Sequence, residues 1–367
     1  MRREPTAAPL RDAAGQRKLP PMGVRKVGTS RILREIGRGG MSVVYEAYQD
    51  GLDRRVAVKA LDTGGELPKE LAERFRREGR AYAQLSHAAI VAVHDLVEKD
   101  EALYLVTEFV DGPDLRRVLA GGAIPPACVA ALGTRLADAL DCVHAHALVH
   151  RDVKPANVMI TRRGEVKLMD LGVAKDPIAT DLTRTGAVVG TPAYVAPEVL
   201  EGEPAAEASD LWALGVTLYE LATGARPFFG DSFPALFTAV RKKPFRPIRE
   251  IMPGFPRRLA HAIERCLEKR PGRRWESAGT LARELEACAD DLLGETRPEE
   301  ALAALVLERA GAPVREDGAA PAAEVAYAAL ARRPRRASGP RKLTWALLTA
   351  LAALTAVGSW YVLAGRF

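Results

Sequence analysis

Cysteine is scarce in this sequence. The chain has four cysteines in 367 residues, and no two of them form a CxxC pair. They are Cys128, Cys142, Cys266 and Cys288. A disulfide scaffold or a zinc-binding cluster would need closer and more regular spacing, so we expect small buried side chains in a reducing compartment. The six histidines show no zinc-type spacing with cysteine, and we assign no metal-ligand role to them.

The charge pattern typical of nucleic-acid binding is also missing. The formal net charge is +6, but the positive excess lies near the two ends of the chain. Residues 1–27 hold seven Lys/Arg and two acids, and residues 332–342 hold six Lys/Arg and no acid. The region between them is therefore mildly acidic, whereas a nucleic-acid enzyme more often carries positive charge on its folded body. With no stripe of aromatic and basic residues either, we expect no nucleic-acid partner.

Apolar periodicity begins only after the first 27 residues. Residues 1–27 are rich in Pro, Ala, Arg and Gly, without an apolar run that would form a signal peptide, and are interpreted as a disordered basic leader. Alternating runs then predict five strands, at 31–36, 43–48, 55–61, 90–97 and 103–109. One helix is predicted among them, at 67–85. Helical patterns follow at 127–147, 209–223, 232–242, 256–269 and 276–292. This order predicts an α+β fold with two lobes, at about 28–109 and 110–292.

The C-terminal part of the chain has a different composition. Residues 293–342 are rich in Ala, Pro, Glu and Arg and are interpreted as a juxtamembrane linker with a short helix near 298–310. Residues 343–365 contain no charge; a helix of this length spans about 34 Å, enough to cross a bilayer core of about 30 Å. Trp345, Trp360 and Tyr361 lie near its ends, as in an aromatic belt.

This segment is therefore predicted to be a single transmembrane helix in the cell membrane. The cations before it place the N-terminal side in the cytoplasm by the positive-inside rule. Ala346/Ala350 and Ala352/Ala356 have small-xxx-small spacing, which points to a homodimer through the span. Because only Arg366 and Phe367 follow, we expect no external sensor domain. The alternative is a buried C-terminal helix of a soluble domain, but such a helix should show a polar face.

A glycine-rich run lies between the first two predicted strands, in Gly37-Arg38-Gly39-Gly40-Met41-Ser42-Val43-Val44. Glycines let a backbone close over phosphates because no side chain blocks the approach. Taken alone, the run is equally consistent with an ordinary hairpin turn. On the next strand, Val56-Ala57-Val58-Lys59 supplies a cation that can hold phosphates, although a single strand lysine is usually a solvated surface charge.

The most specific signal is the run His150-Arg151-Asp152-Val153-Lys154-Pro155-Ala156-Asn157, which follows a long predicted helix. Asp170-Leu171-Gly172 comes after a predicted strand pair at 158–160 and 166–169. In this order and spacing, the motifs resemble those of bacterial eukaryotic-like (Hanks-type) Ser/Thr protein kinases over about residues 31–290. The resemblance implies a protein kinase fold, with a β-rich N-lobe and an α-rich C-lobe. It also implies transfer of the ATP γ-phosphate to Ser/Thr hydroxyls of protein substrates.

The resemblance implies a role for each matching residue. Asp152 accepts the proton of the substrate hydroxyl, Lys154 neutralises the γ-phosphate, and Asn157 and Asp170 bind Mg2+, with Mn2+ as an alternative. The implied ATP-binding residues are Ile36, Gly37, Arg38, Gly39, Gly40, Met41, Ser42, Val43, Val44, Ala57, Lys59, Glu78, Thr107, Glu108 and Val110.

Within that set, Lys59 pairs with Glu78, preferred over Glu73. The resemblance also implies that the backbone of Glu108 and Val110 binds adenine and that Thr107 is a small gatekeeper. The sequence departs from the family pattern twice: Ser42 stands where a third glycine is usual, and Leu171 replaces the usual Phe.

The stretch between Gly172 and Ala196-Pro197-Glu198 is rich in threonine. Thr183 and Thr185 resemble paired autophosphorylation sites of bacterial kinases, with an ordinary polar loop as the alternative. The resemblance also implies two structural contacts: Glu198 pairs with Arg274, and Asp210 holds the backbone of the catalytic loop.

Three other functions are compatible with parts of the pattern. A pseudokinase scaffold would bind nucleotide or partners without phosphoryl transfer, but Lys59, Asp152, Asn157 and Asp170 are all present. A small-molecule kinase of related fold is disfavoured by the Ala196-Pro197-Glu198 segment with its Thr-rich loop. Tyrosine specificity is disfavoured because Lys154, two residues after Asp152, is the Ser/Thr pattern.

Overall fold

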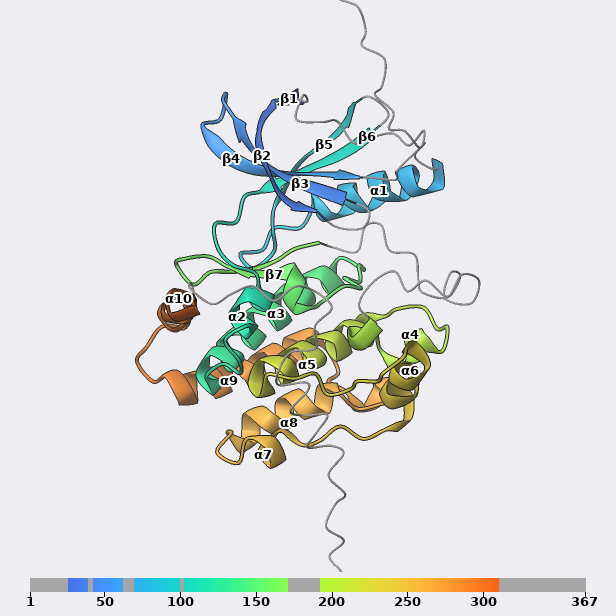
Figure 1. The fold of residues 1–367 in the computed structure, drawn as a ribbon, viewed down its shortest axis with the longest axis vertical. Coiled ribbons are helices and arrows are strands. Elements are labelled where there is room, and N and C mark those ends of the chain that lie inside the picture. The colour runs from blue at the N-terminus through green and yellow to red at the C-terminus, as the bar shows by residue number, and fades with distance from the viewer. Residues whose placement is uncertain (1–25, 39–41, 62–68, 100–101, 171–191, 310–367) are drawn as a thin grey trace, which may run out of the picture. The chain divides into compact units, whose positions relative to one another are not determined.

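The computed structural model describes residues 26–38, 42–61, 69–99, 102–170 and 192–309. All of them belong to one compact unit of the chain. Figure 1 shows the long strands gathered in one lobe and most of the helices in the other. The α+β, two-lobed architecture predicted from the sequence is therefore confirmed.

The N-lobe is built on a six-stranded sheet in the order β1-β2-β3-β4-β6-β5, with all neighbours antiparallel. The strands are β1 (Lys26–Val27), β2 (Ser30–Arg38), β3 (Ser42–Gln49), β4 (Arg54–Leu61), β5 (Val93–Lys99) and β6 (Ala102–Glu108). Successive side chains of a strand point to opposite faces. In β4, Val56, Val58 and Ala60 enter a small apolar cluster, so Ala57 and Lys59 lie on the other face of the sheet.

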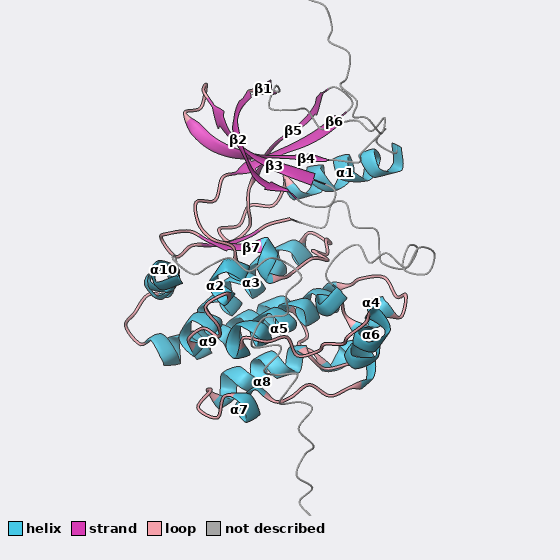
Figure 2. Cartoon of the chain, viewed as in Figure 1, coloured by secondary structure: helices cyan, strands magenta, loops and turns pink. Residues whose placement is uncertain are grey.

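Helix α1 (Lys69–Tyr82) accompanies the sheet in the same lobe (Figure 2). Its Ala72 and Phe75 are buried in the main apolar core, which also contains Leu103 and Leu105 of β6. Burying a side chain as large as that of Phe75 or Leu103 contributes about 1.5–3 kcal/mol relative to leaving it exposed. The helix therefore covers the face of the sheet from which Lys59 projects.

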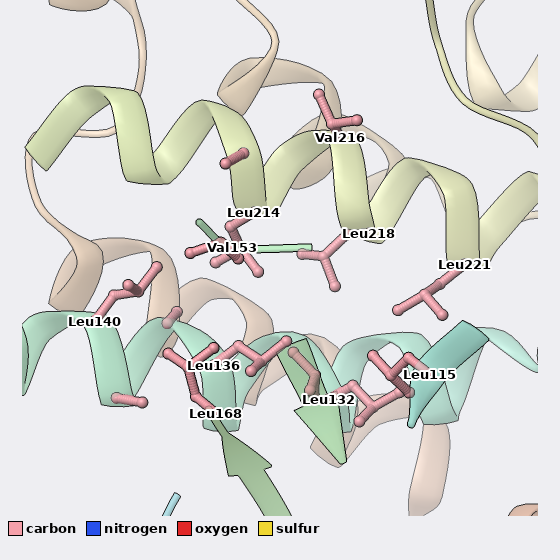
Figure 3. Packing of buried hydrophobic residues seen from close by; sticks show 14 of the residues in the cluster. Leu115, Leu132, Leu136, Leu140, Val153, Leu168, Leu214, Val216, Leu218 and Leu221 are labelled. Carbon is pink, nitrogen blue, oxygen red and sulfur yellow. The ribbon is translucent and has the colours of Figure 1, made fainter. Parts of the chain in front are cut away.

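Two long apolar helices form the centre of the C-lobe: α3 (Pro126–Ala145) and α5 (Glu207–Thr223). Figure 3 shows Leu132, Leu136 and Leu140 of α3 beside Leu218 and Leu221 of α5. Both helices are apolar over most of their circumference, as expected for a helix buried on all sides. α5 ends at Gly224, whose φ of +76° is the left-handed conformation that glycine adopts without strain.

The remaining elements surround this pair. They are α2 (Leu115–Leu119), β7 (Val158–Ile160), β8 (Val166–Leu168), α4 (Pro197–Leu200), α6 (Phe233–Lys242), α7 (Ile248–Ile251), α8 (Arg257–Cys266), α9 (Ala278–Leu293) and α10 (Pro298–Arg309). Helix α9 begins at Ser277, whose side chain accepts a hydrogen bond from the Thr280 N–H in a capping box. The short helices α2, α4 and α7 were not predicted, because one turn carries too little periodicity.

Two predicted boundaries change in the structure. The leader was predicted to run through residue 27, but Lys26 and Val27 form β1 against β2, with Val27 only 1% exposed. The linker was predicted to begin at residue 293, but α10 continues the packed C-lobe to Arg309. Leu302, Leu305 and Val306 are buried there, and burial of this apolar side is the physical reason for the extension.

The predicted span at 343–365 lies outside the described residues. None of the helices within the described ranges is long and apolar enough to cross a membrane. The four cysteines are all described and all free: Cys128, Cys266 and Cys288 are buried and Cys142 is partly buried.

Candidate active site

The catalytic loop is shaped by a buried carboxylate on α5. Asp210, only 1% exposed, accepts hydrogen bonds of 2.8 Å from the backbone N–H groups of His150 and Arg151. His144 of α3 contacts the same carboxylate, with Nε2 at 2.9 Å. Arg151 has a φ of +66°, a conformation that is strained for a non-glycine residue and persists only when its surroundings hold it. The two hydrogen bonds that the His150 and Arg151 N–H groups donate to Asp210 provide that support.

His150 completes the inner side of the loop. Its ring is fully buried and its Nε2 lies 3.2 Å from the Met169 carbonyl, just before Asp170. Burial lowers the pKa of His150, so its imidazole is neutral at neutral pH. The ring lies between the catalytic loop and Met169, which follows β8. The predicted contact between Asp210 and the loop backbone is present, whereas the His144 contact was not predicted.

Three predicted catalytic residues converge at the end of this loop. The Asn157 amide donates a 2.6 Å hydrogen bond to Asp152 Oδ2 and a 2.8 Å bond to the Asp152 carbonyl. Lys154 Nζ lies 3.2 Å from the same Oδ2. A short 3-10 turn at Pro155–Asn157 brings Asn157 back toward Asp152. The side chain of Asp152 is thereby held beside one cation and one amide.

A second group of charges joins the two lobes. Lys59 Nζ on β4 lies 2.5 Å from Asp170 Oδ1, which follows β8. Asp170 has a φ of +50° and its side chain is 42% exposed. Partial burial would raise the pKa of Asp170, but the attraction and hydrogen bond of Lys59 outweigh it, and the pKa lies below its usual value. Asp170 is therefore a carboxylate at neutral pH.

Asn157 and Asp170 have the chemistry of a magnesium site. The Met169 N–H donates to the Asn157 carbonyl at 2.8 Å, which ties together the two ends of the β7–β8 hairpin. Because the Asn157 amide nitrogen is directed to Asp152, its amide oxygen is the atom that can face a cation. Among the described residues, no group of three or more His, Cys, Asp or Glu side chains could hold a metal ion. One carboxylate and one amide suit Mg2+, which usually completes its shell with water and phosphate oxygens.

The hinge, residues 108–110, joins the end of β6 to the C-lobe. Thr107 lies opposite Ala57 in the β4–β6 register, so these two predicted nucleotide-binding residues are neighbours. The Glu108 N–H donates to the Ala92 carbonyl at 2.9 Å, and Val110 is 8% exposed. The Arg55 guanidinium stacks on the Phe109 ring at 4.3 Å, which fixes the strand edge next to the hinge.

Glu108 also makes a contact that the sequence did not predict. Its carboxylate forms a 2.8 Å ion pair with Lys167 of β8, so the hinge is tied to the C-lobe. Both residues line a cavity of about 340 Å3. Lys167 is the central residue of a Val-Lys-Leu strand, and such a pattern predicts only an outward-facing lysine.

The glycine-rich run is described at both of its ends. Gly37 pairs with Val44 and Arg38 with Val43 across β2 and β3. Ile36 is 40% exposed and Val43 is buried, and Ser42 begins β3. Gly39, Gly40 and Met41 lie outside the described residues. Glu78 belongs to α1, but its side chain is not described, so its pairing with Lys59 stays a prediction.

The segment at 171–191 also lies outside the described residues, with Leu171, Thr183 and Thr185. Its C-terminal anchor is described. The Glu198 carboxylate accepts two hydrogen bonds of 2.7 Å from the Arg274 guanidinium, and Arg274 also donates to the carbonyls of Ala208 and Glu268. The Arg274 side chain is fully buried. The ion pair predicted between these two residues is therefore present in the structure.

The two lobes, the hinge and the charged groups between them define a kinase-like phosphotransferase architecture. A sequence model of the protein kinase domain matches residues 30–285. The chain belongs to the protein kinase domain family.

The chain is similar to bacterial Ser/Thr protein kinases. Serine/threonine-protein kinase PknA of Mycobacterium tuberculosis is 40% identical over 269 residues, which cover 72% of this chain and 62% of PknA. Serine/threonine-protein kinase PrkC of Bacillus subtilis is 34% identical over 278 residues, covering 75% of this chain and 43% of PrkC. The matched region is therefore less than two thirds of either relative.

Two solved structures have a similar fold. The PknI kinase domain of Mycobacterium tuberculosis superposes with a TM-score of 0.59 at 28% identity, covering 74% of this chain and all of that domain. A structure of Rad53 residues 1–466 in complex with AMP-PNP has a TM-score of 0.59 at 26% identity, covering 70% of this chain and 64% of that one.

Proposed function

We propose that the protein is a Ser/Thr protein kinase that transfers the γ-phosphate of ATP to hydroxyl groups of protein substrates. The observation that carries this proposal is the convergence at Asp152, whose carboxylate contacts both Lys154 and Asn157. Lys59 and Asp170 meet at the other side of the site. Phosphoryl transfer needs a positioned hydroxyl and cations that neutralise spread negative charge, rather than a covalent protein nucleophile.

Each residue has one task in this proposal. Asp152 accepts the proton of the substrate hydroxyl, and Asn157 holds the Asp152 side chain in place. Lys154 places its ammonium beside the transferred phosphoryl group, and Lys59 holds the α- and β-phosphates. Asn157 and Asp170 would hold Mg2+, or Mn2+ in its place. The bound ion would neutralise phosphate charge.

The adenine ring is proposed to bind at the hinge, against the backbone of Glu108 and Val110. The glycine-rich run from Ile36 to Val44 is proposed to close over the phosphates. Ala57 and Thr107, which are neighbours in the sheet, form the wall of the adenine pocket. The complex of Rad53 with AMP-PNP supports an adenine nucleotide as the ligand of this fold.

A transfer assay tests this function. The full chain is incubated with γ-labelled ATP, Mg2+ and casein as the protein acceptor, followed by phosphoamino-acid analysis. We expect label on serine and threonine. Label on tyrosine only would contradict the proposed specificity, and nucleotide binding without transfer would favour a pseudokinase scaffold.

We further propose that the kinase is activated by autophosphorylation at Thr183 and Thr185. Arg151, next to Asp152 in the catalytic loop, is proposed to bind a phosphate on the segment that these threonines belong to. The double variant Thr183→Ala/Thr185→Ala should lose phosphate from residues 171–191 and lower kcat about tenfold, the equivalent of one charge-assisted hydrogen bond. Mass spectrometry and initial rates measure the two effects. Full activity and unchanged phosphate in this segment would refute the idea.

Residues 343–365 are proposed to anchor the kinase domain to the cytoplasmic face of the membrane and to favour a homodimer. A membrane anchor raises the effective concentration of one copy near another. Deletion of residues 343–367 should therefore release the protein from the membrane fraction. Autophosphorylation at nanomolar protein concentration should fall by about 10²-fold, and it should recover at micromolar concentration. Retention in the membrane fraction would contradict the anchor.

A further inference from the structure

We propose that helix α10 is a positioning element of the active site. In this inference, which rests on the proposed kinase function, α10 holds the β7–β8 hairpin in place. Asn157 comes directly before the first strand of this hairpin, and Asp170 follows its second strand. The helix spans Pro298–Arg309 and so lies beyond the region that matches the protein kinase domain, which ends at residue 285.

Helix α10 is firmly attached to the C-lobe. Leu302, Leu305 and Val306 are 1%, 3% and 6% exposed and belong to the main apolar core. In Figure 1 the helix lies at the edge of the lobe, near β7 and α2, and it contacts α2, α3, α9 and β7. Burying three such side chains contributes several kcal/mol, enough to hold one three-turn helix in a single position.

Polar contacts fix both ends of α10. At its start, Glu299 accepts a 2.6 Å hydrogen bond from the Arg135 guanidinium of α3. At its end, Arg309 Nη2 donates to the Ala123 carbonyl at 3.3 Å, and the guanidinium lies directly on Gly121. These contacts set the position of the helix along its own axis as well as its distance from the lobe.

The first turn of α10 touches the tip of the hairpin. Gly164, in the turn between β7 and β8, has a φ of +85°, and a Cβ atom there would lie 1.9 Å from the Glu299 carbonyl oxygen. The backbones of the turn and the helix are therefore in direct contact, which only glycine permits. The turn itself is closed by two hydrogen bonds, from the Gly164 N–H to the Thr161 carbonyl and from the Thr161 N–H to the Glu165 carbonyl.

The hairpin connects its contact with α10 to the two residues that are proposed to bind the metal. It is short, with three paired positions from Val158–Leu168 to Ile160–Val166. At its open end the Met169 N–H donates to the Asn157 carbonyl, next to Asp170. On its other side, the Ile160 N–H donates to the Pro113 carbonyl and the Arg162 N–H to the Asp111 carbonyl. The hairpin is thus held between α10 and the segment that follows the hinge.

Release of α10 should therefore misplace Asn157 and Asp170 together. A displacement of about 1 Å at a reacting centre can cost up to about 10²-fold in rate. Because both residues are proposed to ligate Mg2+, the affected quantities are the half-saturating Mg2+ concentration and the KM for ATP. Loss of folded protein alone would lower the maximal rate and leave both half-saturation values unchanged.

The test compares Leu305→Asp with Leu307→Asp in the full chain. The two substitutions are chemically identical and two residues apart, but Leu305 is 3% exposed and Leu307 is 80% exposed. We expect Leu305→Asp to raise the half-saturating Mg2+ concentration and the KM for ATP about 5- to 10-fold, and Leu307→Asp to match the wild type. If Leu305→Asp does not fold, Leu305→Ala gives the same comparison in a milder form.

A second pair of variants tests the contact at the hairpin tip. Gly164→Ala should raise both half-saturation values. Gly202→Ala is its control, because Gly202 also has a positive φ, of +100°, and no atom within 4 Å of the added Cβ. Unchanged half-saturation values in active Leu305 and Gly164 variants would overturn the role of α10. An inactive wild-type protein would instead refute the proposed kinase function, so the two failures are distinguishable.

Discussion

Asp152→Asn should lower kcat by about 10²–10⁴-fold, the usual contribution of a positioned general base. Asparagine keeps the size of the side chain and can still contact Lys154 and Asn157, which lie 3.2 Å and 2.6 Å from Asp152 Oδ2. What it loses is the ability to accept the hydroxyl proton. ATP affinity should therefore change little. Initial rates and a fluorescent-nucleotide titration separate the two quantities.

The matched control is Asp290→Asn, which makes the same change at an exposed position on α9. Its kcat should equal that of the wild type. If Asp152→Asn kept more than about a tenth of the wild-type kcat, Asp152 would not be the base. Phosphoryl transfer would then have to rely on positioning and electrostatic stabilisation alone.

The largest loss of stability is expected from Arg274→Met. Arg274 is fully buried, and Glu198 is 15% exposed in their ion pair. Removing one partner of a buried pair leaves the other charge uncompensated, which usually costs about 3–5 kcal/mol of the free energy of unfolding. Arg258→Met is the control, because Arg258 forms a similar two-bond contact with Glu284 but is 50% exposed. Such a surface pair contributes about 0–1 kcal/mol.

Chemical denaturation measures both variants. If Arg274→Met and Arg258→Met lost equal amounts of the free energy of unfolding, burial would not be what makes the Glu198–Arg274 pair important for stability.

The pair also predicts a pH dependence of stability. Burial would raise the pKa of Glu198, but Arg274 outweighs this and the pKa lies below its usual value of 4.5.

The direction of this pH effect follows from linkage. A carboxylate whose pKa is lower in the folded state contributes stability above the pKa of its unfolded state, and that stability is lost as the pH falls through the folded-state pKa. The wild type should therefore lose part of its stability below pH 4.5. Arg274→Met should show a smaller loss over the same acidic range, because Glu198 no longer has its cation.

The sequence predicted the elements that have a clear period or an ordered motif. Alternation in Val56-Ala57-Val58-Lys59 predicted β4, and two long apolar patterns predicted α3 and α5. The spacing of Asp152, Lys154 and Asn157 placed these residues in one loop, and the structure brings their side chains together. Local patterns suffice here because each element is decided by its own residues.

Contacts between distant elements could not be predicted in the same way. The sequence predicted a short helix near 298–310, but nothing in it shows that Glu299 meets Gly164 or that Leu305 is buried. Two further contacts could not be predicted for the same reason. They are the ion pair between Glu108 and Lys167 and the contact of His144 with Asp210. Each depends on how two lobes or two helices pack, and packing of this kind leaves no periodic signal along one chain.

Because most of the cysteines are buried, their reaction with a thiol reagent should report local opening of the fold. Burial raises the pKa of Cys128 to about 11 and that of Cys266 to about 12, so almost no thiolate is present at neutral pH, and the thiolate is the reactive form. An alkylating reagent should therefore modify these positions only when α3 or α8 opens. Cys128 lies under α10, with its Sγ 3.8 Å from the Ala301 carbonyl. The rate at which the reagent alkylates Cys128 should therefore report release of that helix, with no label engineered into the protein.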